Sequence, residues 1–497
     1  MKDSFMSLQT RAVRALLCLS AACVAVVCVR AQEANPRPAD VAELSRQLQQ
    51  TRSELADSRR EIEGLRRSVE ELRATIKGHP AEPDPAATTE PTVTAANQDV
   101  SFLSAKVDEM HQDKVESASK YPVKISGLVL FNSYWNKGIL DIQDLPSLAL
   151  PSFPGAPQPS VGATLRQTTL AIEASGPKLF GARSYADAEV DFGGGSPSMD
   201  FGMTTGLLRL RTAKVSLDWN KTSLSFGQDS LFFSPLSPTS YATVLEPAFS
   251  WSGNLWVWTP AVEVTHRVEL NDAASLVLQG GVLDPLTEEL PEFGGRAPTA
   301  GEITRAPAIA GRIAFDRSKD PRFPLTAGFG GYRSQQQYQN FADIASWTLN
   351  TDLRLGLTKY FEISGEAYKG QAVGGLGGGI WTSVVFPEES GPHTAVHPLR
   401  SAGGWAQLKI NAATKFEINS AFGQDENYGA DLRFFPVSYS IAGFYAMQKN
   451  RTELLNFIYR PSAALLFALE YRHLFTQPAN SVGQTGDQIN LAAGVHF

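Results

Sequence analysis

The sequence predicts an all-β protein, an antiparallel transmembrane β-barrel of about sixteen strands preceded by an N-terminal α-helical coiled coil. Three observations predict this class. From Tyr121 onward apolar and polar residues alternate with a period of two, tight turns alternate with long loops, and the last strand ends on an aromatic residue. The 497 residues divide into a predicted signal peptide (1–31), a coiled coil (32–77), a Pro-rich linker with a short amphipathic helix (78–120) and a barrel (121–497).

The final segment, 488–497, has two different faces. One face carries Ile489, Leu491, Ala493, Val495 and Phe497, and the other carries Gln488, Asn490, Ala492, Gly494 and His496. Terminal segments usually fray, so a patterned strand that reaches the last residue favours pairing on both edges, as in a closed barrel. The edge strand of a β-sandwich would have the same pattern, and this segment alone leaves both interpretations open. In a barrel, it is expected to pair with the first strand near 123–131.

Turn signals alternate in length along the region after Tyr121. Short connectors are predicted at 176–178, 220–221, 271–273, 316–321, 358–359, 412–414 and 460–462. Long loops are predicted at 137–163, 193–205, 230–259, 284–305, 333–343, 370–402, 424–440 and 475–487. Outer-membrane barrels have short periplasmic turns and long external loops, whereas a soluble sandwich has no reason to alternate them. An even strand number places both ends of the barrel on the periplasmic side.

The N-terminal segment has the features of an export signal. Lys2, Arg11 and Arg14 precede an apolar stretch, and cleavage is predicted after Ala31. All three cysteines of the chain lie inside this segment, which excludes a disulfide-built fold for the mature chain. Its removal leaves 40 basic and 50 acidic residues, a net charge near −10, so nucleic-acid binding is not expected.

Heptads over 41–76 predict the coiled coil. Val41, Leu48, Leu55, Ile62, Val69 and Ile76 take the a positions, with Leu44, Leu65 and Leu72 among the d positions. Glu54 can meet Arg59, and Glu61 can meet Arg66, on a neighbouring parallel helix, which predicts self-association. A single amphipathic helix packed on another domain is the alternative, and the heptads do not distinguish a dimer from a trimer.

The strands predict a polar lumen, because a sixteen-strand barrel is too wide for its own side chains to fill. Between 344 and 357, Leu349 and Leu353 alternate with Asn350 and Asp352. On the same reading, the predicted pore-lining residues are Asp187, Glu189, Asp191, Arg267, Arg312, Arg354 and Lys409. Acids and bases on different parts of a narrow wall would select charged solutes. They could equally pair inside the wall and make it rigid, and both interpretations stay open.

The third long loop, 230–259, is rich in aromatic residues and prolines. A loop so apolar is expected to pack inward and narrow the lumen. Within it, Trp256 and Trp258 are expected at the membrane interface. No enzymatic activity, metal site or cofactor is predicted, because no histidine has ligand spacing and no serine lies in a nucleophile elbow.

Short segments across the chain resemble those of a known group. They are 123–127, 224–228, 456–461 and the run from Glu470 to Phe497, together with the heptads. The chain resembles sixteen-stranded trimeric bacterial porins, and more closely the DcaP-like porins, which carry a periplasmic coiled coil before the barrel. The resemblance implies an outer-membrane homotrimer, assembly machinery that reads the terminal Phe497, and passive diffusion of small, often anionic, hydrophilic solutes past the third loop. The acidic residues 187–191 depart from an anion-selective pattern.

Two functions follow from these features. The first is a passive water-filled channel. The second is a structural outer-membrane anchor, whose coiled coil tethers the membrane to a periplasmic partner or to peptidoglycan.

Overall fold

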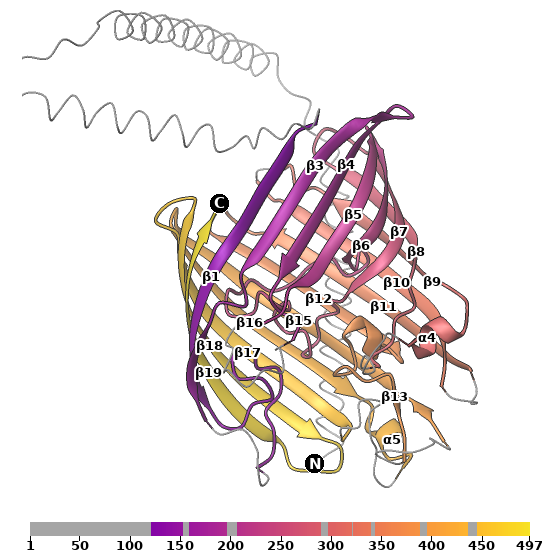
Figure 1. The fold of residues 1–497 in the computed structure, drawn as a ribbon, viewed down its shortest axis with the longest axis vertical. Helices are drawn as coiled ribbons and strands as arrows, with labels where there is room; N and C mark the ends of the chain where they lie inside the picture. The colour runs from indigo at the N-terminus through magenta and orange to yellow at the C-terminus, as the bar shows by residue number, and fades with distance from the viewer. Residues whose placement is uncertain are drawn as a thin grey trace, which may run out of the picture. The chain divides into compact units, whose positions relative to one another are not determined.

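The computed structural model describes residues 121–152, 159–195, 206–289, 297–320, 322–338, 343–387, 395–435 and 445–497. The predicted signal peptide, coiled coil and linker lie outside the described residues. In the described part, the strands form one antiparallel barrel (Figure 1). Among these residues, no helix is long and apolar enough to cross a membrane.

The barrel sheet contains seventeen strand segments in the described residues. They are β1 (Val123–Lys137), β2 (Val161–Thr164), β3 (Thr169–Leu179), β4 (Ala182–Asp191), β5 (Arg209–Trp219), β6 (Thr222–Ser230), β7 (Trp258–Glu269), β8 (Ser275–Leu283), β9 (Ala308–Asp316), β10 (Leu325–Gln337), β11 (Asp343–Gly356), β12 (Phe361–Gln371), β15 (Arg400–Ala413), β16 (Phe416–Asn427), β17 (Met447–Tyr459), β18 (Leu465–Pro478) and β19 (Gln484–His496). Both β2 and β3 pair with successive parts of β1, so they occupy one strand position. The predicted sixteen-strand barrel is confirmed.

Strands β1 and β19 close the barrel, and they lie side by side in Figure 1. The backbone N–H of Gly127 donates to the carbonyl of Phe497 at 3.0 Å, so pairing reaches the last residue. The predicted closure is confirmed, but the predicted partner segment 123–131 overlaps the observed one only in part. Strand β19 pairs with Leu128 to Lys137, while the start of β1 pairs only with β3. Tilted strands in a closed barrel are staggered, and the sequence pattern does not specify that stagger.

One predicted turn is also wrong. Residues 176–178 form an irregularity inside β3, and the turn lies at Phe180 and Gly181, whose φ angles are 51° and 81°. Proline lacks the N–H that a ladder needs, so it is accommodated where the pairing is broken. The other six turns and the eight long loops lie where predicted, to within a few residues.

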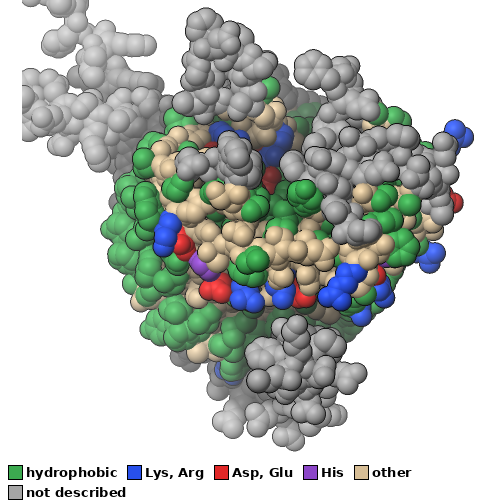
Figure 2. Space-filling model, turned by 90° about the horizontal axis from the view of Figure 1, so that it is seen from below, with side chains coloured by type: hydrophobic (Ala, Val, Ile, Leu, Met, Phe, Trp, Pro, Cys, Tyr) green, Lys and Arg blue, Asp and Glu red, His purple; other side chains and the backbone are tan. Residues whose placement is uncertain are grey.

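The outer wall of the barrel is apolar and the inner wall is polar. On β11, Leu349 is 50% exposed and Leu353 is 36% exposed, whereas the alternating Asn350 and Asp352 are 2% and 4% exposed. Figure 2 shows hydrophobic side chains over the flank of the barrel and charged side chains in a band across the viewed face. An apolar exterior around a closed ladder is the arrangement that a lipid bilayer requires.

The hydrophobic core lies inside the barrel, between the wall and the third loop (residues 231–257). Leu231, Phe233 and Leu255 of this loop pack with Tyr332 of β10 and Tyr368 of β12. A second cluster joins Tyr241 and Val244 of the loop to inward residues of the closing strands, namely Leu128, Leu130, Ile458, Leu466, Ala468 and Ala492. Smaller elements lie in other loops: α4 (Ala300–Ile303), η1 (Gly374–Leu376), β13 (Val384–Val385), β14 (His397–Pro398) and α5 (Gly429–Leu432).

Candidate pore interior

The third loop is held against the inner wall by side-chain amides. The amides of Asn132, Gln167, Asn450 and Asn456 donate to the backbone carbonyls of Tyr241, Ala242, Trp251 and Thr239, at 2.8 to 2.9 Å. These donors belong to β1, to the segment between β2 and β3, and to β17, while the loop itself connects β6 and β7. The loop therefore crosses the interior, and its predicted inward packing is confirmed.

Two wall carboxylates also hold the third loop. Glu366 on β12 accepts the Ser234 hydroxyl at 2.5 Å and the Leu236 N–H at 2.8 Å. Glu470 on β18 accepts the Ser240 hydroxyl at 2.6 Å. The donors are two serine hydroxyls and one backbone N–H, that of Leu236, and these bonds satisfy polar groups of the loop that have no sheet partner.

Glycines allow the third loop to lie directly on the wall. A Cβ at Gly253, whose φ is +97°, would approach backbone atoms of Gly404 to 2.3 Å and the carbonyl of Gln424 to 2.5 Å. A Cβ at Gly423 would meet the carbonyl of Ser252 at 2.4 Å. Only glycine fits such a backbone-to-backbone approach.

Trp256 is half-buried, its ring lies 5.4 Å from that of Trp258, and its interface position stays a prediction. The backbone N–H of Trp256 donates to the carbonyl of Leu376, and a Cβ at Gly377 would meet its ring at 2.6 Å, so the indole packs against the loop that follows β12. Trp258 begins β7, and the guanidinium of Arg211 lies 4.8 Å from its ring centre. Its interface role stays a prediction.

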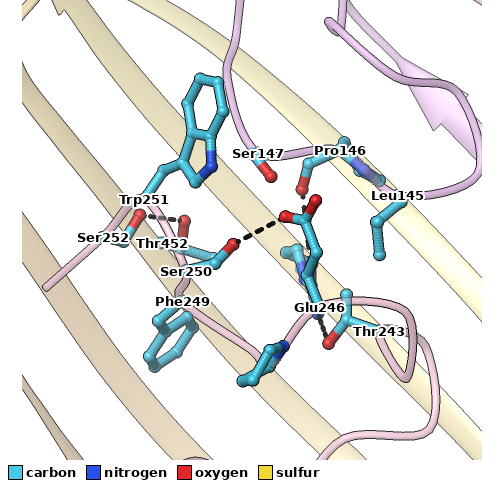
Figure 3. A pocket seen from close by; sticks show the side chains of 12 residues that line it. Leu145, Pro146, Ser147, Thr243, Glu246, Phe249, Ser250, Trp251, Ser252 and Thr452 are labelled. Atoms are coloured by element: carbon cyan, nitrogen blue, oxygen red, sulfur yellow. Dashed lines mark hydrogen bonds between the residues drawn. The ribbon is translucent and has the colours of Figure 1, made fainter. Parts of the chain in front are cut away.

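A small cavity lies between the first loop (residues 138–160), the third loop and strands β17 and β18 (Figure 3). In Figure 3 the Glu246 carboxylate points toward Ser250, whose hydroxyl donates to it at 3.3 Å. Burial raises the pKa of Glu246, and the positive charge of Arg209 opposes this shift. Arg472 borders the cavity and donates to Glu470 at 2.7 Å. The cavity is thus part of the contact between two loops and the wall.

The structure places the predicted acids 187–191 on the inner face of β4. Their partners in register across β3 are Glu173, Ala171 and Thr169. Asp191 is fully buried and accepts two bonds from Arg209, at 2.8 and 3.1 Å. Glu189 lies 3.2 Å from the guanidinium of Arg211. Asp187 is half-buried and forms no ion pair among the described residues.

Each predicted basic residue lies beside a carboxylate of the wall. Arg312 donates to both carboxylate oxygens of Asp352, at 2.8 and 2.6 Å, and also to Gln279. The other pairs are Arg267 with Asp316 at 2.6 Å, Arg354 with Glu362 at 3.1 Å, and Lys409 with Glu417 at 3.5 Å. The structure therefore distributes the four bases among separate local pairs instead of bringing them together. For these four bases the geometry shows pairing inside the wall, one of the two open interpretations, whereas Asp187 forms no such pair among the described residues.

Sequence reasoning missed the amides that hold the loops. Four of the asparagines that donate to loop carbonyls, Asn132, Asn136, Asn450 and Asn456, are all 0–1% exposed and lie on inner faces. Asparagine is depleted in strands, so its recurrence at period-two positions was an available signal for inward loops. Among the described residues, no group of three or more His, Cys, Asp or Glu side chains is placed to hold a metal ion.

The barrel is similar to solved outer-membrane channels. The outer-membrane channel DcaP of Acinetobacter baumannii has 15% identity and a TM-score of 0.58, over 77% of this chain and 99% of that chain. Salmonella typhi OmpF in complex with daunomycin has 12% identity and a TM-score of 0.46, over 77% of this chain and 99% of that one. Pseudomonas putida OprB has 8% identity and a TM-score of 0.44, over 76% of this chain and 94% of that one.

No protein-family model matches the sequence, and no curated protein sequence matches it. At 15% identity, the similarity to DcaP concerns the fold. Together with the closed barrel, it shows that this chain has the fold of a sixteen-stranded outer-membrane porin, the resemblance that its segments predicted.

Proposed function

We propose that this protein is an outer-membrane porin, through which small hydrophilic solutes diffuse passively along a water-filled lumen narrowed by the third loop. The observation that carries the proposal is a closed barrel with an apolar outer wall and a polar inner wall, crossed inside by an anchored loop. A barrel of sixteen strands encloses more space than its own side chains fill. Diffusion through it needs no covalent chemistry.

The inner-wall side chains are unequally buried, which supports the proposed narrowing of the lumen by the third loop. Inner residues of the half that faces the third loop are almost inaccessible, as for Asn350, Asn456 and Asn490, which are 1–2% exposed. On the opposite half, Glu173 of β3 is exposed, and Glu263 of β7 is half-buried. The proposed passage therefore runs along the inner face of β3–β8.

The outer wall supports self-association. A groove there is lined by residues of β1, β17, β18 and β19, among them Phe131, Phe457, Phe467 and Leu491. Apolar barrel walls can pack against one another in a symmetric assembly. With the heptads 41–76, this supports a homotrimer that has a periplasmic coiled coil and is inserted by the barrel-assembly machinery.

The experiment is a planar lipid bilayer recording with the purified full-length protein. Stable steps of ion conductance are expected after insertion, and the same bilayer with detergent buffer alone is the control. A bilayer that stays silent, although protease protection shows insertion, would refute the channel. That outcome would instead favour the structural anchor with its tether to a periplasmic partner or peptidoglycan.

The solute-size limit tests the role of the third loop. Vesicles that contain the protein should swell in small sugars and exclude larger oligosaccharides.

The resemblance implies a preference for anionic solutes. Among the described residues, the wall of the proposed passage carries acidic side chains that form no ion pair, and these do not favour anions.

A further inference from the structure

Charge pairing on the inner wall leaves an excess of acid. The inner-wall bases outside the earlier four pairs also lie beside carboxylates: Arg209 with Asp191, Arg211 with Glu189, Lys214 with Asp229, Arg460 with Glu417, and Arg472 with Glu470. A salt-bridged cation is largely neutralised by its partner at distances beyond the pair. These bases therefore contribute little positive field to the lumen.

Three carboxylates on the accessible half of the described wall form no ion pair with a cation. Asp187 faces Lys214 in register, but the ammonium group of Lys214 pairs with Asp229. Among the described residues, Glu173, Asp187 and Glu263 form no ion pair, and Glu263 accepts only neutral donors, the Thr265 hydroxyl at 2.7 Å and the Gln279 amide at 3.0 Å. Glu173 and Asp187 are neighbours in register across β3 and β4. Away from the turns, Lys124 is the one inner-wall base in the described strands without a carboxylate at ion-pair distance, and it faces Glu173 in register. Lys124 can offset one of the three negative charges, and the two bases that share Glu417 leave one further positive charge, so the wall still keeps a net negative charge.

We infer that the passage prefers cations over anions, and that Glu173, Asp187 and Glu263 set this preference. The inference rests on the proposed channel function. A water-filled lumen with a low-dielectric wall concentrates counter-ions of the fixed charge and excludes ions of the same sign. Small inorganic cations and small amine-bearing solutes are the class that such a wall favours.

The test is the reversal potential in a KCl gradient across a planar bilayer. The wild-type channel should show a K⁺ to Cl⁻ permeability ratio above one. The triple variant Glu173→Gln, Asp187→Asn, Glu263→Gln should bring that ratio to one or below. Glu453→Gln is the matched control, because Glu453 lies on the outer face of β17, opposite Phe422 and two residues before Leu455, and its loss should leave the ratio unchanged.

Salt dependence gives a second measurement on the wild-type protein. The Debye length grows from about 3 Å at 1 M to about 10 Å at 0.1 M, so the cation preference should rise as the salt is diluted. If the triple variant fails to fold, the single variant Glu263→Gln, which keeps an acceptor for Thr265, should give a smaller shift in the same direction.

The outcomes separate this inference from the channel itself. Conductance with a ratio below one in the wild type, or with a ratio that the triple variant does not change, overturns the inference and leaves the porin intact. Absence of conductance overturns the porin proposal first.

Discussion

At the scale of single residues, the environment of a charge decides its role more than its position on the inner face. Arg312 and Arg354 both point inward, yet their side chains are 7% and 52% exposed. The pair of Arg312 with Asp352 is buried, so removal of one partner leaves an uncompensated charge. The pair of Arg354 with Glu362 is partly solvated, and such pairs contribute little to stability.

Substitution of these two arginines should therefore lower the free energy of unfolding by different amounts. Arg312→Ala is expected to lower the free energy of unfolding by about 3–5 kcal/mol. Arg354→Ala should lower it by about 0–1 kcal/mol. Reversible unfolding in urea, followed by tryptophan fluorescence in vesicles, measures both. Equal losses of unfolding free energy would show that the buried pair contributes no more to stability than the solvated pair.

Gly253 offers a second residue-scale prediction. Gly253→Ala places a methyl group against the backbone of β15 and β16 and strains a positive φ, so the third loop should detach from the wall. Single-channel conductance is expected to rise and to fluctuate more. Gly280→Ala is the matched control, because a Cβ there meets nothing within 4 Å. A Gly253→Ala channel with wild-type conductance would contradict the proposed narrowing.

At the scale of elements, the loops are joined to one another as well as to the wall. Glu288, in the loop between β8 and β9, accepts the Ser383 N–H at 2.6 Å and the Ser383 hydroxyl at 2.7 Å. Burial raises the pKa of Glu288 from 4.5 to about 7, and the nearby charge of Glu289 adds to this shift. The two loops therefore form a contact whose strength depends on protonation.

This contact should weaken as the pH rises. A carboxyl whose pKa is raised on folding binds its proton more tightly when the two loops are in contact than when they are apart. The stabilisation of the loop contact is therefore complete below about pH 4.5 and is lost as the pH rises through about 7. Hydrogen exchange at the Ser383 amide, corrected for the intrinsic rate, should report less protection across this window.

Two variants check the assignment to Glu288. Glu288→Gln keeps an acceptor for the Ser383 N–H and should remove the pH dependence. Glu289→Gln removes the neighbouring like charge and should move the transition to lower pH. A pH dependence that persists in Glu288→Gln would assign the effect to another group.

At the scale of the whole molecule, the described strands close into a barrel on their own ladder. Except for the short β2, which pairs with β1 alone, every barrel strand in the described residues has a partner on both edges, and β1 pairs with β19 through ten registered residue pairs. A closed ladder leaves no strand edge exposed. The barrel is therefore expected to fold independently of the heptads.

Deletion of residues 32–98 tests this expectation. The shortened protein should insert and conduct in a planar bilayer with wild-type step size, but its trimer band on mildly denaturing electrophoresis should weaken. The loss of conductance on deletion would show that the coiled coil is required for the barrel itself. An unchanged trimer would assign association to the barrel walls alone.

Much of the architecture was predictable because its signals are local. Leu349 and Asn350 differ in burial because neighbouring residues in a strand point to opposite faces, and this alternation is written in the sequence. Asn271, in a tight turn between β7 and β8, was likewise predictable from local turn chemistry. The turn predicted at 176–178 was wrong because Gly and Pro occur at bulges within strands as well as in turns.

The sequence by itself determined the barrel, its strand number and the polarity of its two walls, because these depend on period-two patterning and on the spacing of turns. The tertiary structure alone decided the register of closure, the pairing of Arg312 with Asp352, and the course of the third loop across the interior. These features depend on the stagger of tilted strands and on contacts between residues far apart in the chain, which no local pattern encodes. The same contacts leave Glu173, Asp187 and Glu263 outside the ion pairs of the described wall.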